Sequence, residues 1–377
     1  MIIQTIAIFH DAYRDLADRK LFWITLILSA VAMLGFAGFH ADDQALTYFG
    51  FKFPDLSIPS RILYKHFFSS FVIGFWLTFV SAILALISTA SIFPDLVSGG
   101  SIDLFLSKPI SRLRLFFTKY LAGLLFVFIQ VSLFITLAFF VLGIRSGSWK
   151  PALFWGIPIV VCFFSYLFAI CVFIGVFWRS TLTAIFLTLL FWGICYSLSL
   201  TELILLNVRT DAELTLNRLN MQVDTYDKRI ARMQPTSQPG QPPSTQPEPR
   251  LLADFKATRE RLAAEQHESV SSVATWKRWH GIFFSVKSFL PKTTETIALL
   301  DRILVSREET AELMPEHHGK STSKPVHDEF EPPRARPEIE TQNKLRDRSV
   351  SWIVGTSLLF EAVVLSLAAW IFQRRDF

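Results

Sequence analysis

The chain has 377 residues, of which 51% are hydrophobic and 18% are charged, and its formal net charge is +5. Its mean hydropathy is +0.39. A single soluble core does not combine such a hydropathy with so many charges, so the two kinds of residue must be segregated along the chain. The composition therefore excludes an ordinary soluble globular domain and indicates a membrane protein that carries a separate polar region.

Residues 1–20 are predicted to form an amphipathic helix on the membrane surface. Charged residues from Asp11 to Lys20 follow a short apolar start, and no small-residue cleavage site appears, so we expect no secretory signal here. The apolar side chains that can share one face of this helix are Ile3, Ile6, Ala7, Tyr13 and Leu16.

Six stretches are long and apolar enough to cross the hydrocarbon core, which takes about 20 residues of helix. Five of them fill residues 21–206, and the sixth lies in the C-terminal region 349–377. We therefore predict an all-α polytopic membrane protein with six transmembrane helices. The predicted spans are residues 21–39, 67–93, 116–144, 153–178, 181–206 and 352–372.

The distribution of basic residues predicts the orientation of these spans. With the N-terminus inside, the cytoplasmic segments hold Arg14, Arg19, Lys20, Lys108, Arg112, Arg114, Lys119, Arg179, Arg374 and Arg375. The short outer loops hold only Lys52, Arg61, Lys65, Arg145 and Lys150. Because basic residues favour the cytoplasmic side, we expect both termini, and also residues 94–115, to be cytoplasmic.

The stretch between the second and third predicted spans, residues 93–123, carries the most informative pattern. It has an acidic, glycine-containing start at Asp95, Gly99 and Gly100, then an amphipathic turn, and then a Lys108-Pro109 break before a Ser-Arg-Leu-Arg run. A new span follows at once. This order resembles the cytoplasmic coupling segment of ABC transporter permeases of the type-2 export class. The C-terminal Phe372-Gln373-Arg374-Arg375-Asp376 resembles the ends of permeases of the same class.

The resemblance implies that residues 94–115 dock a separate ATPase subunit. Apolar side chains of the turn would form the docking face, and basic side chains would make polar contacts, because a short amphipathic helix fits a groove on a partner. The expected docking residues are Asp95, Ile102, Leu104, Phe105, Leu106, Lys108, Arg112 and Arg114. Alternatively, these basic residues only fix the topology and bind anionic lipid head groups.

Two fragments imitate nucleotide-binding motifs. Val97–Ser101 looks like the signature loop of an ABC ATPase, but no ATPase domain fits around it. Gly319-Lys320-Ser321 looks like the end of a P-loop, but Met314 stands where the first glycine is required. We therefore expect no catalytic residue and no cofactor in this chain, and we expect ATP and Mg²⁺ on the partner ATPase.

Polar residues inside the predicted spans are the other candidate sites, because a charge in hydrocarbon is costly. Glu361 lies near the middle of the sixth span and Gln130 near the middle of the third, and we expect the two to meet inside the bundle. They form either a substrate or proton path, or an interhelical hydrogen bond that helps the bundle to assemble. Glu202, nearer the outer end of the fifth span, is expected to reach interfacial water.

Residues 207–348 are predicted to form an extracytoplasmic insertion. A heptad pattern from Ala212 to Met233 continues the fifth span outward, and a second helical pattern begins near Leu251. We expect a helical hairpin with helices at about 208–233 and 251–284, a Pro-rich linker at 234–250, and little fixed structure at 306–348. The insertion is either a spacer or a binding element.

No metal site is predicted. His317, His318 and His327 lie near Glu316 and Asp328, but their spacing fits no standard site and their segment lacks a structural pattern. The three cysteines, Cys162, Cys171 and Cys195, lie within predicted spans and are expected to be buried apolar residues.

Together these features predict the permease subunit of an ATP-driven ABC exporter in a bacterial inner membrane. The resemblance implies two ATPase subunits and a second permease subunit, in a homodimer or a heterodimer, with lipid contacts and no nucleic acid. One rival is a subunit that transmits ATP-driven motion to the outer hairpin and so regulates a periplasmic partner. A continuous stiff helix through Asn207 would favour it. Another rival is an ion-coupled secondary transporter built around Glu361.

Overall fold

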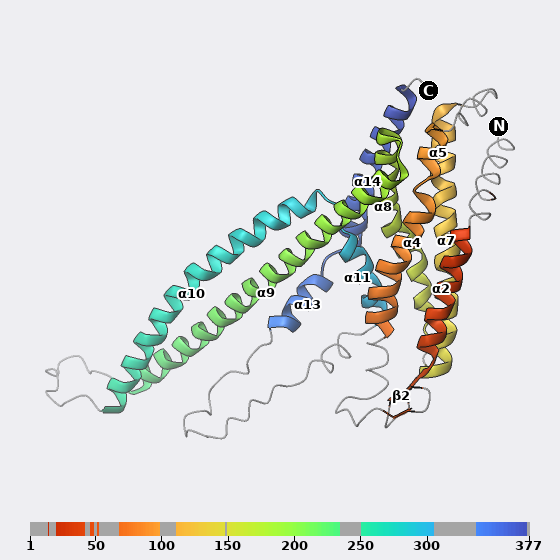
Figure 1. Ribbon diagram of the computed structural model, residues 1–377. Helices are drawn as coiled ribbons and strands as arrows, with labels where there is room; N and C mark the ends of the chain where they lie inside the picture. Colours follow the sequence, from red (N-terminus) through yellow and green to blue (C-terminus); the bar gives the residue numbers. More distant parts are fainter. Residues whose placement is uncertain are drawn as a thin grey trace. The chain divides into compact units, whose positions relative to one another are not determined.

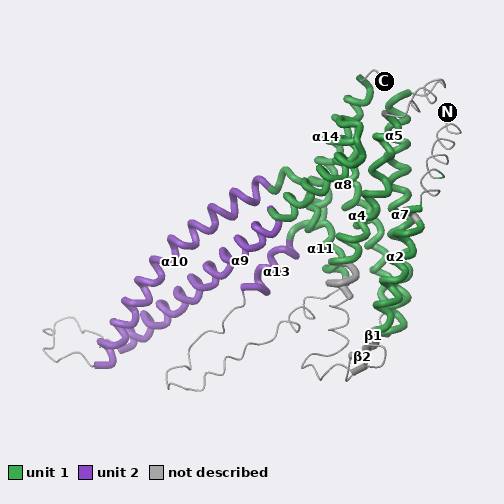
Figure 2. Tube along the Cα trace, in the orientation of Figure 1, with its two compact units in different colours: residues 1–197, 287–317, 348–377 green, residues 198–286, 318–347 purple. Residues whose placement is uncertain are grey.

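The computed structural model describes residues 14, 20–41, 46–48, 51–52, 68–98, 111–147, 149–233, 250–304 and 337–374. The chain divides into two compact units (Figures 1 and 2). Unit 1 comprises residues 1–197, 287–317 and 348–377, and unit 2 comprises residues 198–286 and 318–347. Apart from Arg14 and Lys20, the predicted surface helix at 1–20 lies outside the described residues.

The described residues are almost entirely helical. Unit 1 contains α2 (Lys20–Ala37), the π-helical η1 (Phe68–Ser81), α4 (Ala82–Thr89), α5 (Ile92–Ser98), α7 (Arg112–Ser146), the 3-10 turn η2 (Pro151–Trp155), α8 (Gly156–Trp178), α11 (Thr293–Leu304) and α14 (Val350–Arg374). Helices α9 (Thr181–Met233) and α10 (Arg250–Ser288) have residues in both units, and α13 (Pro337–Arg346) belongs to unit 2. Three short strands, β1 (Phe39–Ala41), β2 (Leu46–Tyr48) and β3 (Phe51–Lys52), pair antiparallel in that order, with Phe39 opposite Tyr48 and Thr47 opposite Lys52.

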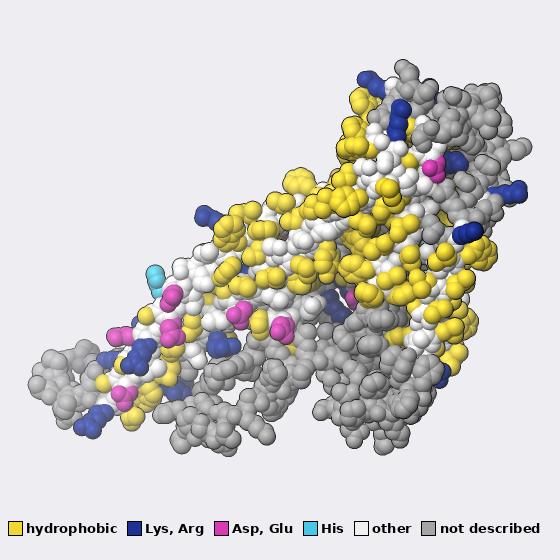
Figure 3. All heavy atoms as spheres, in the orientation of Figure 1, with side chains coloured by type: hydrophobic (Ala, Val, Ile, Leu, Met, Phe, Trp, Pro, Cys, Tyr) yellow, Lys and Arg dark blue, Asp and Glu magenta, His cyan; other side chains and the backbone are white. Residues whose placement is uncertain are grey.

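Five described helical stretches are long and apolar enough to cross a membrane, so this is a multi-pass membrane protein. They are Phe75–Val97, Arg112–Arg145, Pro151–Trp178, Thr181–Met233 and Val350–Arg374. They overlap the second to sixth predicted spans. The apolar stretch at the first predicted span, Trp23–Ala37, is shorter. Hydrophobic side chains cover much of the face of unit 1 seen in Figure 3, as a lipid-facing surface requires.

Helix α8 forms the centre of unit 1. Its sequence is apolar on all sides, which is the pattern of a helix that is buried all round. Helices α7, α14, α11, α5 and α4 all pack against it. Phe163, Phe168 and Val176 are completely buried as a result.

Two glycines allow this close packing. A Cβ at Gly175 on α8 would lie 3.1 Å from the Pro94 ring of α5, and a Cβ at Gly123 on α7 would lie 2.7 Å from the Phe168 ring. A Cβ at Gly123 would require the Phe168 ring to shift, and a Cβ at Gly175 would make a tight contact with Pro94. The helices on both sides of the predicted coupling segment, α5 and α7, are therefore held tightly on α8.

Helix α11 departs from the predicted boundary of the insertion. Residues 207–348 are predicted to be extracytoplasmic as one insertion, and within that range residues 287–304 belong to unit 1, where α11 packs on α8. Ile297, Leu299 and Leu300 are buried there. The short apolar face of α11 was overlooked because it lies between a Pro-containing turn and a long polar segment.

At two other places in the predicted insertion, the structure differs from the prediction. Residues 337–346 form α13, although little fixed structure was predicted from 306 to 348, while residues 305–336 lie outside the described part of the chain. Helix α10 ends at Ser288, four residues later than predicted.

Within unit 2, α9 and α10 run antiparallel. The Arg259 guanidinium donates to Asp227 at 2.9 Å, and Gln266 donates to Asn220 at 2.6 Å. Later residues of α10 thus contact earlier residues of α9. The rings of Tyr226 and Phe255 lie 5.9 Å apart near the tip. The linker at 234–249 lies outside the described residues.

Candidate functional site

The predicted docking segment is described only at its two ends. Asp95 lies on α5, and Arg112 and Arg114 lie in the first turn of α7. The other predicted docking residues, Ile102, Leu104, Phe105, Leu106 and Lys108, lie outside the described residues. The docking face itself therefore stays a prediction. The structure describes the two helices on either side of it, α5 and α7.

Ser111 of the family-like motif starts helix α7. Its backbone is extended, and its hydroxyl accepts a hydrogen bond from the Arg114 N–H at 3.4 Å, which is the geometry of an N-cap. The serine before the two arginines thus fixes where the helix begins. A cap here satisfies a backbone N–H that the helix itself leaves unbonded.

Arg112 has a partner inside the protein. Its guanidinium Nη1 donates to the backbone carbonyl of Gln373 at 3.3 Å, at the end of α14. A basic side chain at a helix C-terminus satisfies a carbonyl that has no partner in its own helix. The two segments that resemble the type-2 permease class, residues 93–123 and the C-terminus, are therefore in direct contact.

An aromatic cluster joins four helices next to this contact. Phe93 of α5 and Phe116 of α7 have ring centroids 5.0 Å apart, and Phe116 lies 5.7 Å from Phe372 of α14. Phe93 also lies 6.5 Å from Phe168 of α8. All four rings are buried. A displacement of α5 or the start of α7 must therefore move or repack α8 and α14, because buried rings leave no free volume.

Glu361 meets different residues from those predicted. The Tyr120 hydroxyl donates to Glu361 Oε1 at 2.7 Å, and the Ser165 hydroxyl donates to Oε2 at 2.7 Å. These side chains come from α7, α8 and α14. Gln130, the predicted partner, instead donates to Ser81 at 3.4 Å, and its Oε1 has no hydrogen-bond partner among the described residues.

The Glu361 cluster accommodates either protonation state of the carboxyl group. Each hydroxyl has one proton and a second acceptor within reach: the Ser165 carbonyl lies 3.3 Å from Tyr120 Oη, and the Cys162 carbonyl lies 2.8 Å from Ser165 Oγ. When the hydroxyls donate to these carbonyls, a protonated Glu361 can donate to one of them. The cluster is satisfied within the bundle, as a polar group at membrane depth requires.

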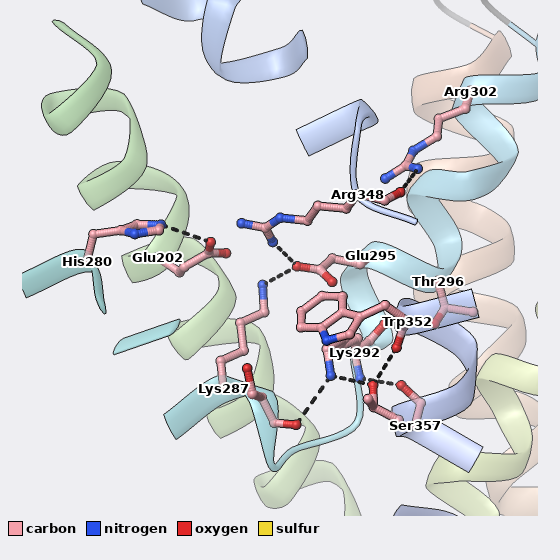
Figure 4. Close-up of polar contacts among 12 residues, drawn as sticks. Glu202, His280, Lys287, Lys292, Glu295, Thr296, Arg302, Arg348, Trp352 and Ser357 are labelled. Carbon is pink, nitrogen blue, oxygen red and sulfur yellow. Dashed lines mark hydrogen bonds and ion pairs between the residues drawn. The ribbon is translucent and has the colours of Figure 1, made fainter. Parts of the chain in front are cut away.

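A second polar cluster lies where α10, α11 and α14 meet in unit 1 (Figure 4). Lys287 Nζ donates to Glu295 Oε1 at 2.9 Å, and Arg348 donates to the same oxygen. Arg302 donates to the Arg348 carbonyl at 2.9 Å. The Lys287 and Glu295 side chains are less than a tenth exposed, so the pair is shielded from water. These hydrogen bonds hold Arg348, at the start of the segment 348–374, against residues 287–304.

Lys292 lies buried beside this cluster. Its N–H donates to Ser357 Oγ at 2.9 Å, and its ammonium group donates to Thr356 Oγ1 at 2.6 Å. The same ammonium group lies 4.2 Å from the centre of the Trp352 ring, which is a cation–π distance.

Glu202 does not reach water as predicted. It is almost completely buried in unit 2, where its Oε1 lies 3.4 Å from Nε2 of His280 on α10. Arg209 Nη1 lies 3.3 Å from Nδ1 of the same ring. Because a guanidinium only donates, we assign Nδ1 as the acceptor and Nε2 as the protonated nitrogen, which donates to Glu202.

This network continues from α9 to α13. The Arg209 Nε donates to Glu213 at 2.8 Å, and Lys344 donates to the other carboxylate oxygen of Glu213 at 2.8 Å. Lys344 also donates to Thr210 at 3.2 Å. The base of the hairpin is thus held by charge-assisted hydrogen bonds as well as by apolar contacts.

Several of these residues were missed because their signal is weak in sequence. Tyr120 and Ser165 are ordinary residues of apolar helices, and only their position opposite Glu361 distinguishes them. His280 follows three basic or aromatic residues, and such a sequence is typical of a membrane–water interface. Lys287 and Glu295 lie eight residues apart across a turn, so no helical spacing links them.

Among the described residues, no group of three His, Cys, Asp or Glu side chains is placed to hold a metal ion. The predicted candidates between Glu316 and Asp328 lie outside those residues. All three cysteines are free thiols; Cys171 and Cys195 are buried and Cys162 is half-buried.

A comparison with known protein families matches residues 6–234 to the family described as ABC-2 family transporter protein. The match covers more than half of the chain. It includes the whole stretch 93–123 and ends at the tip of α9. No curated protein and no solved structure matches the chain.

Glu361 substitutions test the interhelical hydrogen-bonding role of this carboxyl group. We expect Glu361→Gln to keep both neighbours bonded and leave stability almost unchanged, whereas Glu361→Leu lowers stability by about 1–2 kcal/mol. In the Glu361→Leu background, Tyr120→Phe should add little, because the shared bond is already lost. Unfolding of the detergent-solubilised protein measures this. Equal losses for the Gln and Leu variants would contradict the assignment.

Glu295→Ala tests the second cluster. Removing the carboxylate that Lys287 and Arg348 share should destabilise unit 1 by about 3–5 kcal/mol, since two buried cations lose their common anion. Asp227→Ala is the matched control, because the Asp227–Arg259 pair is 48% and 41% exposed and surface pairs contribute little. Thermal unfolding of the two variants checks this, and equal melting temperatures would show that the cluster is not important for stability.

Proposed function

The chain belongs to the ABC-2 family of transporter proteins, and we propose that it is the membrane subunit of an ATP-driven exporter that docks a separate ATPase. Membership makes it a membrane permease of an ABC transporter. We propose three further properties: that the chain docks an ATPase, that it transports its substrate outward, and that the complex contains two copies of each kind of subunit. The observation that carries it is that the family match includes the entire 93–123 stretch.

The proposed docking segment connects α5 to α7, and it therefore acts directly on the helices beside α8. The Phe93–Phe116–Phe372 contacts and the Arg112–Gln373 bond extend that connection to α14. A motion of the ATPase that shifts the docked segment would thus tilt α5 and α7 together and repack them against α8 and α14. Such a rigid-body shift between discrete packings is how small displacements are amplified.

The proposed orientation places this end of unit 1 in the cytoplasm. The start of α7 and the end of α14 are adjacent through Arg112 and Gln373 and carry the basic residues Arg112, Arg114 and Arg374. Cytoplasmic ends are rich in such residues. With α2 as the first of six spans, both termini would be cytoplasmic and the distal part of the α9–α10 hairpin would be extracytoplasmic.

The complete exporter would contain two permease subunits and two ATPase subunits. ATP and Mg²⁺ would bind to the ATPase, and this chain would carry out no covalent chemistry. Its own contribution is the pathway and the transmission of motion. Large apolar side chains exposed on α2, α9 and α14 offer surface for lipid and for the second permease subunit.

A second candidate function is supported by helix α9. The helix continues without interruption from Thr181 to Met233, and thus through Asn207, where a flexible joint would have argued against a mechanical role. In this reading, ATP-driven motion passes along α9 and regulates a partner outside the membrane. The buried Glu202–His280–Arg209 contacts would keep α10 attached to α9 during such motion.

Co-purification tests docking. An ATPase encoded next to this protein should co-purify with it, and Leu104→Asp with Phe105→Asp should abolish that association, because a charge on the apolar docking face is costly to bury. Leu251→Asp on α10 is the control, since Leu251 is 64% exposed and lies outside the proposed segment. Undiminished association of the double variant would show that the contact lies elsewhere.

A truncated hairpin separates transport from mechanical signalling. The cut must spare α11 and the His280 contacts, and Asn220 and Gln266 are hydrogen-bonded neighbours that a short Gly-Ser linker can join. We expect export to persist when residues 221–265 are replaced in this way, within about twofold of the intact protein, because the change leaves unit 1 intact. Loss of export with a folded, ATPase-bound protein would favour the mechanical function.

A further inference from the structure

The last turns of α10 carry an exposed apolar stripe. Trp279, Ile282 and Val286 are each 50% exposed, and their spacing of three and four residues places them on one helical face. His280, one position after Trp279, points inward to Glu202. The stripe is therefore a separate face from the one with which α10 packs on α9.

The depth of this stripe follows from α9. A hydrocarbon core about 30 Å thick takes about 20 residues of a helix that rises about 1.5 Å per residue. Since α9 begins at Thr181, its residues up to about Leu200 lie in hydrocarbon, and Ile204 lies near the head groups. Leu200 and Ile204 are themselves exposed apolar residues one turn apart.

The contacts between the two helices show which residues of α10 lie at the same depth as this part of α9. His280 contacts both Glu202 and Arg209, so it lies level with this stretch of α9. Because the helices are antiparallel, Ile282 and Val286 lie beside earlier, deeper residues of α9. Trp279 is thus at the level of the head groups, and the other two side chains are at the level of the acyl chains.

The charges of α10 follow the same depth. Lys277 and Arg278 are exposed immediately before Trp279, and beyond Leu206 the sequence of α9 becomes polar, with Asn207, Arg209, Asp211 and Glu213. Nearer the tip of the hairpin, charged side chains gather on the surface (Figure 3). A Lys-Arg-Trp step between a charged and an apolar segment is typical of a membrane–water interface.

We propose that the Trp279–Ile282–Val286 stripe is a lipid-binding face, which inserts into the leaflet where the apolar part of α9 ends. Acyl chains contact Ile282 and Val286, the Trp279 ring lies among the head groups, and Lys277 and Arg278 attract anionic phospholipid. The base of the hairpin is thus anchored in lipid, and only its distal part stands in water. This inference requires only that α9 spans the membrane, and it does not depend on ATPase docking or export.

Photocrosslinking identifies what covers the stripe. The full-length protein is reconstituted in vesicles of phosphatidylethanolamine and phosphatidylglycerol, with p-benzoyl-phenylalanine in place of Ile282, of Val286 or of Val270. Val270 is the matched control, because it is an apolar α10 residue that is 51% exposed but lies in the charged part of the hairpin. We expect phospholipid adducts, detected by mass spectrometry, at positions 282 and 286 and none at 270.

Two results would overturn the proposal. Crosslinked dimers at 282 and 286 would show that a second copy of the chain covers the stripe. Absence of adducts at all three positions, with the protein folded, would show that the stripe faces water. To test the basic residues, Lys277→Gln with Arg278→Gln should shift the adducts at 282 from phosphatidylglycerol towards phosphatidylethanolamine; an unchanged lipid ratio would remove the anionic preference.

Discussion

The bilayer requires every polar group at membrane depth to find its partner inside the protein. Glu361 meets this requirement through hydroxyl groups of two neighbouring helices. Outside the candidate spans, the buried Glu295 carboxylate is paired with two cations, Lys287 and Arg348. Both clusters bring together helices that are distant in sequence. Each cluster thus stabilises contacts between segments of unit 1 that are separate in sequence.

Helix α8 links these clusters to the end of the bundle where the family-like motif lies. It carries Ser165 at the Glu361 cluster, Phe168 in the aromatic cluster and, at its start, the contact with α11. Because most of α8 is buried against its neighbours, a displacement of this helix must be accommodated by the helices packed on it. That property suits a subunit whose work is to transmit the motion of a partner across a membrane.

The sequence predicted the features that depend on composition and local pattern. Long apolar runs predicted the five spans that the structure describes as long enough to cross a membrane, and the pattern of residues 93–123 predicted the family that the comparison confirms. Features that depend on which helical faces meet could not be read in this way. Gln130 was predicted as the partner of Glu361, whose partners are Tyr120 and Ser165. The contact of Arg112 with Gln373 joins residues 261 positions apart. The buried face of α11 is too short to be recognised in the sequence.

The central claim is that this chain transmits the work of a separate ATPase across the membrane. ATP hydrolysis by an ABC ATPase that co-purifies with it, measured in vesicles with and without this chain, tests that claim most directly. The account predicts that the chain alters the hydrolysis rate, and that cysteine pairs which lock α5 to α8 at Pro94 and Gly175 abolish the alteration. A rate that is the same with and without the chain, although the two proteins bind, would contradict it.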